Sequence, residues 1–347
     1  MRPAHLTRVI ETEFASTREG HHTPVMIWGA PGIGKSQIVA QVAQTHHVAL
    51  LDIRLSQMEP SDLRGIPFRD GNSVEWAIPG MLPNAERHGP EGILFLDEIT
   101  SAPPSVSAAA YQLILDRRLG DYEVPEGWAI IAAGNRQGDR GVTYSMPAPL
   151  ANRFSHFEFE LNLDDWVAWA YQNDIDDRII AFLRFRPEML FEFDPSHNPV
   201  AFPSPRSWEF SHRALKKFEF NNELRLGTLQ ACVGPAAGIE LDAFICNLDQ
   251  LPDINAIIRG EKLPAPKEID LQYAVAAALV GHAIRHQGSD NAAKVHGNIL
   301  AYASMFPEKE MGVMLVSDMH RAIGATIFDL PQFAQWSNAV ADVMLYS

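Results

Sequence analysis

The stretch Gly29–Ser36, GAPGIGKS, has the spacing G-x-x-x-x-G-K-[ST], which is typical of a loop that holds phosphate groups. Its glycines allow the backbone to curl so that successive N–H groups point at phosphate oxygens. Lys35 would then reach the β- and γ-phosphates of a nucleotide, and the hydroxyl of Ser36 would bind Mg²⁺. The residues predicted to bind the nucleotide are Gly29, Ala30, Pro31, Gly32, Ile33, Gly34, Lys35, Ser36 and Gln37.

Two adjacent acids end the apolar run ILFLDE (Ile93–Glu98). A carboxylate at the carboxyl end of a buried strand lies beside the phosphate loop in an open α/β sheet. We therefore expect Asp97 to hold the Mg²⁺, directly or through water, and Glu98 to orient and polarise an attacking water molecule. The adjacent pair favours a hydrolase, because a small-molecule kinase would not need the second acid. The alternative is that the two acids only end a strand.

Asn135 ends another apolar run, AIIAAGN (Ala129–Asn135). From a neighbouring strand end its amide would hold the attacking water or the γ-phosphate, although Asn after Gly is also ordinary turn chemistry. The sequence contains no N-K-x-D motif, the usual guanine-reading signal of GTPases, so the predicted nucleotide is ATP.

Short β-rich runs alternate with helical patterns in the first half of the chain, which predicts an α/β fold with a parallel sheet of five strands and helices on both faces. After Leu161 helical periodicity dominates, and prolines and charges cluster at Gly260–Asp270. We therefore expect an α/β nucleotide-binding domain at 1–161, a helical lid at 162–259 and a C-terminal helical extension at 260–347. The predicted strands are 24–29, 48–55, 92–99, 128–135 and 155–161, and the predicted helices of this domain are 35–47 and 105–116.

The composition is that of an ordinary folded protein with a formal net charge of −15. That charge has the wrong sign for a protein that neutralises phosphates along DNA or RNA, so a nucleic-acid partner is not favoured. No apolar run approaches the roughly 20 residues that span a bilayer, and the N-terminus has no continuous apolar segment typical of a secretory signal. Only two cysteines occur, without C-x-x-C spacing. We expect a soluble cytoplasmic protein.

Three histidine pairs carry weaker signals. His282 and His286 stand four apart on a predicted helix, a spacing that can bind metal, but no third ligand follows the pattern of zinc peptidases. The pairs at 21–22 and 46–47 flank the first strand and its helix, and we expect them at the surface.

The motifs GAPGIGKS, ILFLDE, AAGN, PLANRF and SPRSW follow one another over roughly residues 20–220. In this order they resemble an AAA+ ATPase, and within that superfamily the chain is similar to the MoxR-like branch. The resemblance implies a nucleotide-binding domain, a helical lid and a homo-oligomeric ring, usually a hexamer.

The same resemblance assigns roles to three polar residues. Asn135 matches the family's sensor 1. Arg206, in SPRSW, matches sensor 2 at the start of a lid helix, where it would touch the γ-phosphate of its own subunit. Arg153, in PLANRF, matches the arginine finger that completes the site of the adjacent subunit, although Arg136 and Arg140 lie close and are alternatives. A solvated surface arginine is the other reading of Arg153.

Two further segments resemble insertions of the MoxR-like branch: Asp62–Pro83, with RDGN as its turn, and Asp116–Trp128. Both are predicted to be hairpins, and in rings of this family such hairpins contact the client. The alternative is that both are ordinary surface hairpins, in which Phe68 and Trp76 only pack the hairpin against the domain. The leading hypothesis is therefore a Mg²⁺-dependent ring ATPase that remodels or assembles a protein client, in the manner of a chaperone. The family commonly works with a partner that carries a von Willebrand factor A domain. The alternatives are a nucleic-acid-dependent motor or restriction-type translocase, and a nucleotide switch with little turnover.

Overall fold

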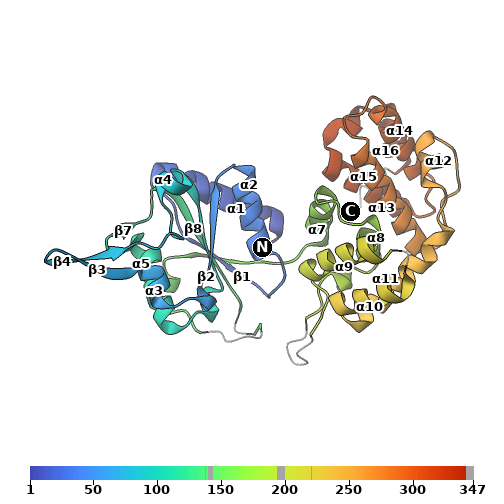
Figure 1. The fold of residues 1–347 in the computed structure, drawn as a ribbon. Coiled ribbons are helices and arrows are strands. Elements are labelled where there is room, and N and C mark those ends of the chain that lie inside the picture. The colour runs from blue at the N-terminus through green and yellow to red at the C-terminus, as the bar shows by residue number, and fades with distance from the viewer. Residues whose placement is uncertain (137, 140–143, 194–199, 220, 341–347) are drawn as a thin grey trace. The chain divides into compact units, whose positions relative to one another are not determined.

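The computed structural model describes residues 1–136, 138–139, 144–193, 200–219 and 221–340 (Figure 1). The chain divides into two compact units, Met1–Asn162 and Leu163–Ser347. In the described part of the chain, no helix combines the length and the apolar character needed to cross a membrane.

The first unit is built on a five-stranded sheet whose order is β2-β5-β8-β1-β9, with parallel pairing throughout. The central strands β5 and β8 consist almost wholly of buried residues, as expected for a sheet covered on both faces. Figure 1 shows α1 and α2 on one side of the sheet and α3 and α5 on the other. The predicted α/β class with a parallel five-stranded sheet is confirmed. The strands are β1 (Val25–Trp28), β2 (Ala49–Arg54), β5 (Glu91–Asp97), β8 (Gly127–Gly134) and β9 (Ser155–Glu158).

One long helix of this unit, α1 (Pro3–Ser16), was not predicted from the sequence; it packs beside α2. Its buried residues Leu6, Ile10 and Phe14 are spaced by four, so they form one apolar stripe. The other helices of the unit are α2 (Lys35–Thr45), α3 (Pro60–Arg64), α4 (Ala85–His88), α5 (Pro104–Asp116) and α6 (Ala148–Ala151).

Both predicted hairpins form. In the first, β3 (Ile66–Asp70) pairs with β4 (Ser73–Ala77) around a two-residue turn in which Gly71 has a φ of 58°. Every residue of both strands is exposed, and Phe68 and Trp76 keep 48% and 43% of their surface open to solvent, so they do not pack the hairpin down. The second hairpin, β6 (Arg118–Leu119) with β7 (Tyr122–Glu123), is anchored instead, because the buried Tyr122 donates its hydroxyl to Pro83 O at 2.8 Å.

His22 corrects the prediction for the first histidine pair. His21 is exposed, but the side chain of His22 is only 4% exposed, and its Nε2 accepts a hydrogen bond from the Ile130 N–H of β8 at 2.8 Å. Burial, followed by the charge of Arg117, lowers the pKa of His22 to about 4. The imidazole is therefore neutral, and it is hydrogen-bonded to the backbone of β8 just before β1 begins.

The second unit contains only helices and turns among its described residues, with one hydrophobic core that extends from Trp166 to Val340. The division predicted at residue 260 falls between α12 and α13, and it stays a prediction. The helices are α7 (Leu163–Gln172), α8 (Asp177–Phe185), α9 (Pro205–Phe218), α10 (Asn222–Val233), α11 (Pro235–Asn247), α12 (Ile254–Arg259), α13 (Ile269–Arg285), α14 (Ala292–Ala303), α15 (Lys309–Ile323) and α16 (Pro331–Ala339).

Candidate active site

The predicted phosphate loop connects the carboxyl end of β1 to the first turn of α2. Gly32 and Gly34 have φ values of 81° and 103°, in the left-handed region that favours glycine, and Gly34 is the N-cap of α2. Gly29 donates its N–H to Gly134 O at 3.2 Å, which ties the start of the loop to the end of β8. The loop is thus curled in front of a helix N-terminus, an arrangement that suits an anionic ligand.

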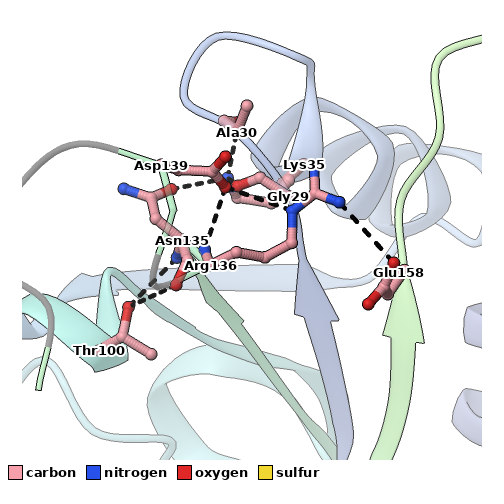
Figure 2. Close-up of polar contacts among 8 residues, drawn as sticks. All are labelled: Gly29, Ala30, Lys35, Thr100, Asn135, Arg136, Asp139 and Glu158. Carbon is pink, nitrogen blue, oxygen red and sulfur yellow. Dashed lines mark hydrogen bonds and ion pairs between the residues drawn. The ribbon is translucent and has the colours of Figure 1, made fainter. Parts of the chain in front are cut away.

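The ammonium group of Lys35 lies inside this loop. Its Nζ donates to Gly29 O at 2.6 Å, to Ala30 O at 3.0 Å and to Asn135 Oδ1 at 3.1 Å (Figure 2). The side chain is nearly buried, so the charge is fixed at the loop and not spread into solvent. Lys35 therefore joins the phosphate loop to the predicted water-holding or phosphate-sensing amide of Asn135.

Ser36 and Asp97, the two predicted magnesium ligands, lie on different elements but are hydrogen-bonded to each other. Ser36 Oγ donates to Asp97 Oδ2 at 3.0 Å, from the first turn of α2 to the last residue of β5. A hydroxyl and a carboxylate oxygen are hard ligands of the kind that Mg²⁺ takes beside phosphate oxygens. The donor set therefore fits a magnesium ion.

Glu98 occupies a tight position directly after β5. Its backbone is left-handed, with a φ of 56°, and its N–H donates to Asp97 Oδ1 at 2.9 Å. Its carboxylate accepts a hydrogen bond from the hydroxyl of Ser56, which follows β2. Ser56 was not among the predicted residues, and no pattern in the sequence marks it.

The carboxylate of Asp52 lies close to those of Asp97 and Glu98. Partial desolvation raises the pKa of Asp52, an exposed residue of β2, and the charges of Asp97 and, more weakly, Glu98 raise it further, while Arg54 opposes them. The carboxyl ends of β2 and β5 therefore hold an excess of negative charge that a divalent cation would offset.

Thr100 fixes the backbone of Asn135. It is almost fully buried, accepts the Asn135 N–H at Oγ1 over 3.1 Å, and donates the same hydroxyl to Asn135 O over 3.4 Å (Figure 2). The turn that follows Glu98 is thus hydrogen-bonded to the end of β8. Thr100, like Ser56, was not among the predicted site residues.

Arg136, an alternative arginine finger, is engaged within its own unit. Its backbone N–H donates to Asp139 Oδ2 at 3.0 Å, and its guanidinium lies 3.7 Å from Glu158 Oε2 of β9 (Figure 2). The other alternative, Arg140, lies outside the described residues.

Arg153 stands on a short turn after α6, on which Leu150 and Phe154 are buried and Arg153 itself is exposed. Its N–H donates to Leu150 O at 2.9 Å. Within the described part of the chain its guanidinium has no hydrogen bond or ion pair.

Arg206 belongs to the second unit, where it is exposed in the first turn of α9. Ser204 caps this helix and accepts the N–H of Ser207 at 3.2 Å, so the turn that carries Arg206 is well defined. Its relation to the phosphate loop stays a prediction.

Comparison with known proteins also indicates a nucleotide-binding domain. Residues 24–154 match the family described as "AAA domain (dynein-related subfamily)". Midasin of Giardia intestinalis is 25% identical over 171 residues, which are 46% of this chain and 4% of midasin, so the chain spans only a small part of that relative's length.

Two solved structures are similar at low identity. A candidate ATPase from Cytophaga hutchinsonii is 15% identical with a TM-score of 0.34, over 96% of this chain and 88% of that one. The Thermotoga maritima RuvB Holliday junction branch migration motor is 17% identical with a TM-score of 0.37, over 80% of this chain and 81% of that one. Likeness at this level says nothing about what this chain acts on.

A curled glycine loop before a helix, with Ser36 and Asp97 in contact behind it, defines a P-loop nucleotide-binding ATPase domain. Within that class, residues 24–154, which carry this site, match the AAA domain of the dynein-related subfamily, so this part of the chain is an AAA ATPase domain.

Proposed function

We propose that this chain is the subunit of a Mg²⁺-dependent ATPase ring, a homohexamer, that remodels or assembles a protein client. Catalysis is divided between subunits: each one binds and positions ATP, and Arg153 of the neighbour completes the site. The proposal rests on one observation above all, the exposed guanidinium of Arg153, which has no side-chain partner among the described residues although its turn is anchored. The competing Arg136 is held by Asp139 and Glu158.

Within one subunit the loop residues Gly29–Gln37 hold the phosphates, and Lys35 binds the β- and γ-phosphates. Ser36 and Asp97 hold Mg²⁺, which, when bound, offsets phosphate charge. Glu98 accepts a hydrogen bond from the attacking water and orients it in line with the γ-phosphate. While Ser56 holds that carboxylate, Glu98 is less available to the water, so this bond must loosen in the active state.

Two residues report on the γ-phosphate in this mechanism. Asn135 accepts a hydrogen bond from Lys35, so loss of the γ-phosphate would shift Lys35 and, through this bond, the end of β8. Arg206 binds the γ-phosphate from the first turn of α9 and makes the helical unit respond to ATP. Both roles rest on the resemblance to AAA+ proteins and on the exposure or contacts described above.

The client is a polypeptide in this proposal. The first hairpin carries Ile66, Phe68, Val74 and Trp76 with large exposed fractions, and exposed apolar surface of this kind favours protein contact. The net charge of −15 disfavours a nucleic-acid track. A partner with a von Willebrand factor A domain belongs to the same proposal, on the resemblance to the MoxR-like branch.

The test uses subunits with complementary defects. Arg153→Ala retains its own nucleotide site, and Lys35→Ala loses that site but keeps Arg153. Each variant alone is expected to hydrolyse ATP about 10³-fold or more slowly than the wild type, and a mixture is expected to regain turnover. Failure of the mixture to recover, although both variants assemble, would exclude a role for Arg153 in the adjacent site. Strong stimulation of the wild-type ATPase by DNA at physiological salt would instead favour a nucleic-acid motor.

A further inference from the structure

The imidazole of His156 contacts two segments. One is the end of β1, which leads into the phosphate loop of its own subunit, and the other is the turn that carries Arg153, which is proposed to act in the adjacent subunit. His156 lies in the edge strand β9, and Trp28 is the last residue of β1, directly before the phosphate loop. Trp28 is paired in register with Glu158, two residues after His156, so the two rings stand on the same face of the sheet. They stack with their centroids 5.9 Å apart and an interplanar angle of 20°.

Hydrogen bonds on both ring nitrogens fix the tautomer of His156. The indole Nε1 of Trp28, which can only donate, lies 2.9 Å from His156 Nδ1. Nδ1 is therefore the acceptor, and the proton of the neutral ring is on Nε2. That nitrogen lies 2.8 Å from Ala151 O and donates to it.

Ala151 is the last residue of α6, two positions before Arg153. Its carbonyl lies at the helix end, where it accepts the Phe154 N–H at 3.2 Å and the Nε2–H of His156 as a second, shorter hydrogen bond. The ring of Phe154, on the other side of Arg153, meets His156 edge-on at 6.1 Å. The turn that carries Arg153 is thus held from its Ala151 side and from its Phe154 side by the same imidazole.

We propose that His156 is a positioning residue for Arg153, which ties the arginine's turn to the end of β1 and so to the phosphate loop of the same subunit. This inference rests on the proposed role of Arg153 in the adjacent site and names the residue that orients it. The guanidinium stays free for the neighbour's nucleotide, while its backbone is fixed by the Trp28–His156–Ala151 hydrogen bonds.

Two substitutions separate the hydrogen bonds from the ring. His156→Phe keeps an aromatic ring against Trp28 and removes both hydrogen bonds. His156→Gln has an amide oxygen and an amide nitrogen, which can accept from Trp28 and donate to Ala151. We expect His156→Phe to lower kcat by about 10- to 100-fold, the size of effect that a displacement of about 1 Å produces, with the KM for ATP unchanged. His156→Gln is expected to retain most of the activity.

Mixing experiments then decide whether His156 acts through Arg153. Lys35→Ala subunits carry an intact His156 and Arg153, so adding them to His156→Phe subunits should restore turnover, as for Arg153→Ala. The double variant Arg153→Ala/His156→Phe should be no slower than Arg153→Ala alone, because two changes on one path do not add.

The outcomes separate this inference from the proposed function. If Lys35→Ala rescues Arg153→Ala but does not rescue His156→Phe, then His156 serves its own subunit and the inference is wrong. The same conclusion follows if His156→Phe raises the KM for ATP. If neither is rescued, the role of Arg153 in the adjacent site fails, and the inference fails with it. Should His156→Phe not assemble, Trp28→Phe removes the Trp28–His156 hydrogen bond and leaves the one to Ala151. It must then lower kcat with the KM for ATP unchanged and be rescued by Lys35→Ala, and a raised KM or no rescue would overturn the inference.

Discussion

Acidification should weaken the first unit through His22. An ordinary histidine in the unfolded chain binds a proton near pH 6.5, whereas burial and the charge of Arg117 lower the pKa of His22 in the fold to about 4. Its Nε2 accepts the Ile130 N–H, which a protonated ring could not do. The unfolded state therefore binds more protons in this range, so the stabilisation is complete above pH 6.5 and is lost as the pH falls toward 4.

The size of this effect follows from the two pKa values. The gap corresponds to roughly 3 kcal/mol in total, of which about 2 kcal/mol is lost between pH 7 and pH 5. The matched variant is His22→Gln, whose amide oxygen can accept the Ile130 N–H but does not titrate. Other groups with shifted pKa values, such as Asp177 and His282, change both proteins equally and cancel in the comparison.

Urea denaturation at pH 7 and pH 5 measures the difference. We expect the free energy of unfolding of the wild type to fall by about 2 kcal/mol more than that of His22→Gln between these two pH values. An equal fall in both proteins would show that His22 does not lose a proton on folding, and the reasoning about its burial would be refuted.

Three further changes test the catalytic arrangement. Thr100→Val leaves the half-buried N–H of Asn135 without its hydroxyl partner, so it should lower kcat by about tenfold or more. Thr100→Ser keeps the hydroxyl and should be near wild type in steady-state ATPase assays. Ser56→Ala releases the carboxylate of Glu98 and should raise basal turnover, by up to about tenfold for one hydrogen bond; a decrease would contradict the proposed competition. Glu98→Gln should bind ATP and assemble but not hydrolyse it, as seen by a stable ATP-bound complex on a sizing column, and rapid release of ADP and phosphate would count against Glu98 as the residue that orients water.

Local sequence was sufficient for the framework of the site. The strand-loop-helix pattern around Lys35 and the two acids after β5 are contiguous signals, and the parallel strand order brings their ends together without further information. For this reason Ser36 and Asp97, which are 61 positions apart, could be expected to meet, and they do.

The residues that adjust the site could not be predicted in this way. Ser56 is 42 positions from Glu98, Thr100 is 35 from Asn135, and Trp28 is 128 from His156. Each is a single polar or aromatic side chain whose partner is fixed by tertiary packing, so no periodicity or spacing marks it.

Helix α1 and His22 were missed for related reasons. The apolar stripe of α1 has only three buried residues, and polar residues surround it in the sequence. His22 is buried because it continues the line of β1 beside β8, a position that a turn rich in histidine and threonine does not reveal.

The division of catalysis between subunits is tested most directly by the structure of the assembled Glu98→Gln protein with ATP and Mg²⁺, solved by electron cryomicroscopy. The account predicts that the guanidinium of Arg153 lies within hydrogen-bond distance, about 3 Å, of the γ-phosphate bound by the adjacent subunit. A guanidinium that faces solvent at every interface, or one that contacts only the nucleotide of its own subunit, would contradict it.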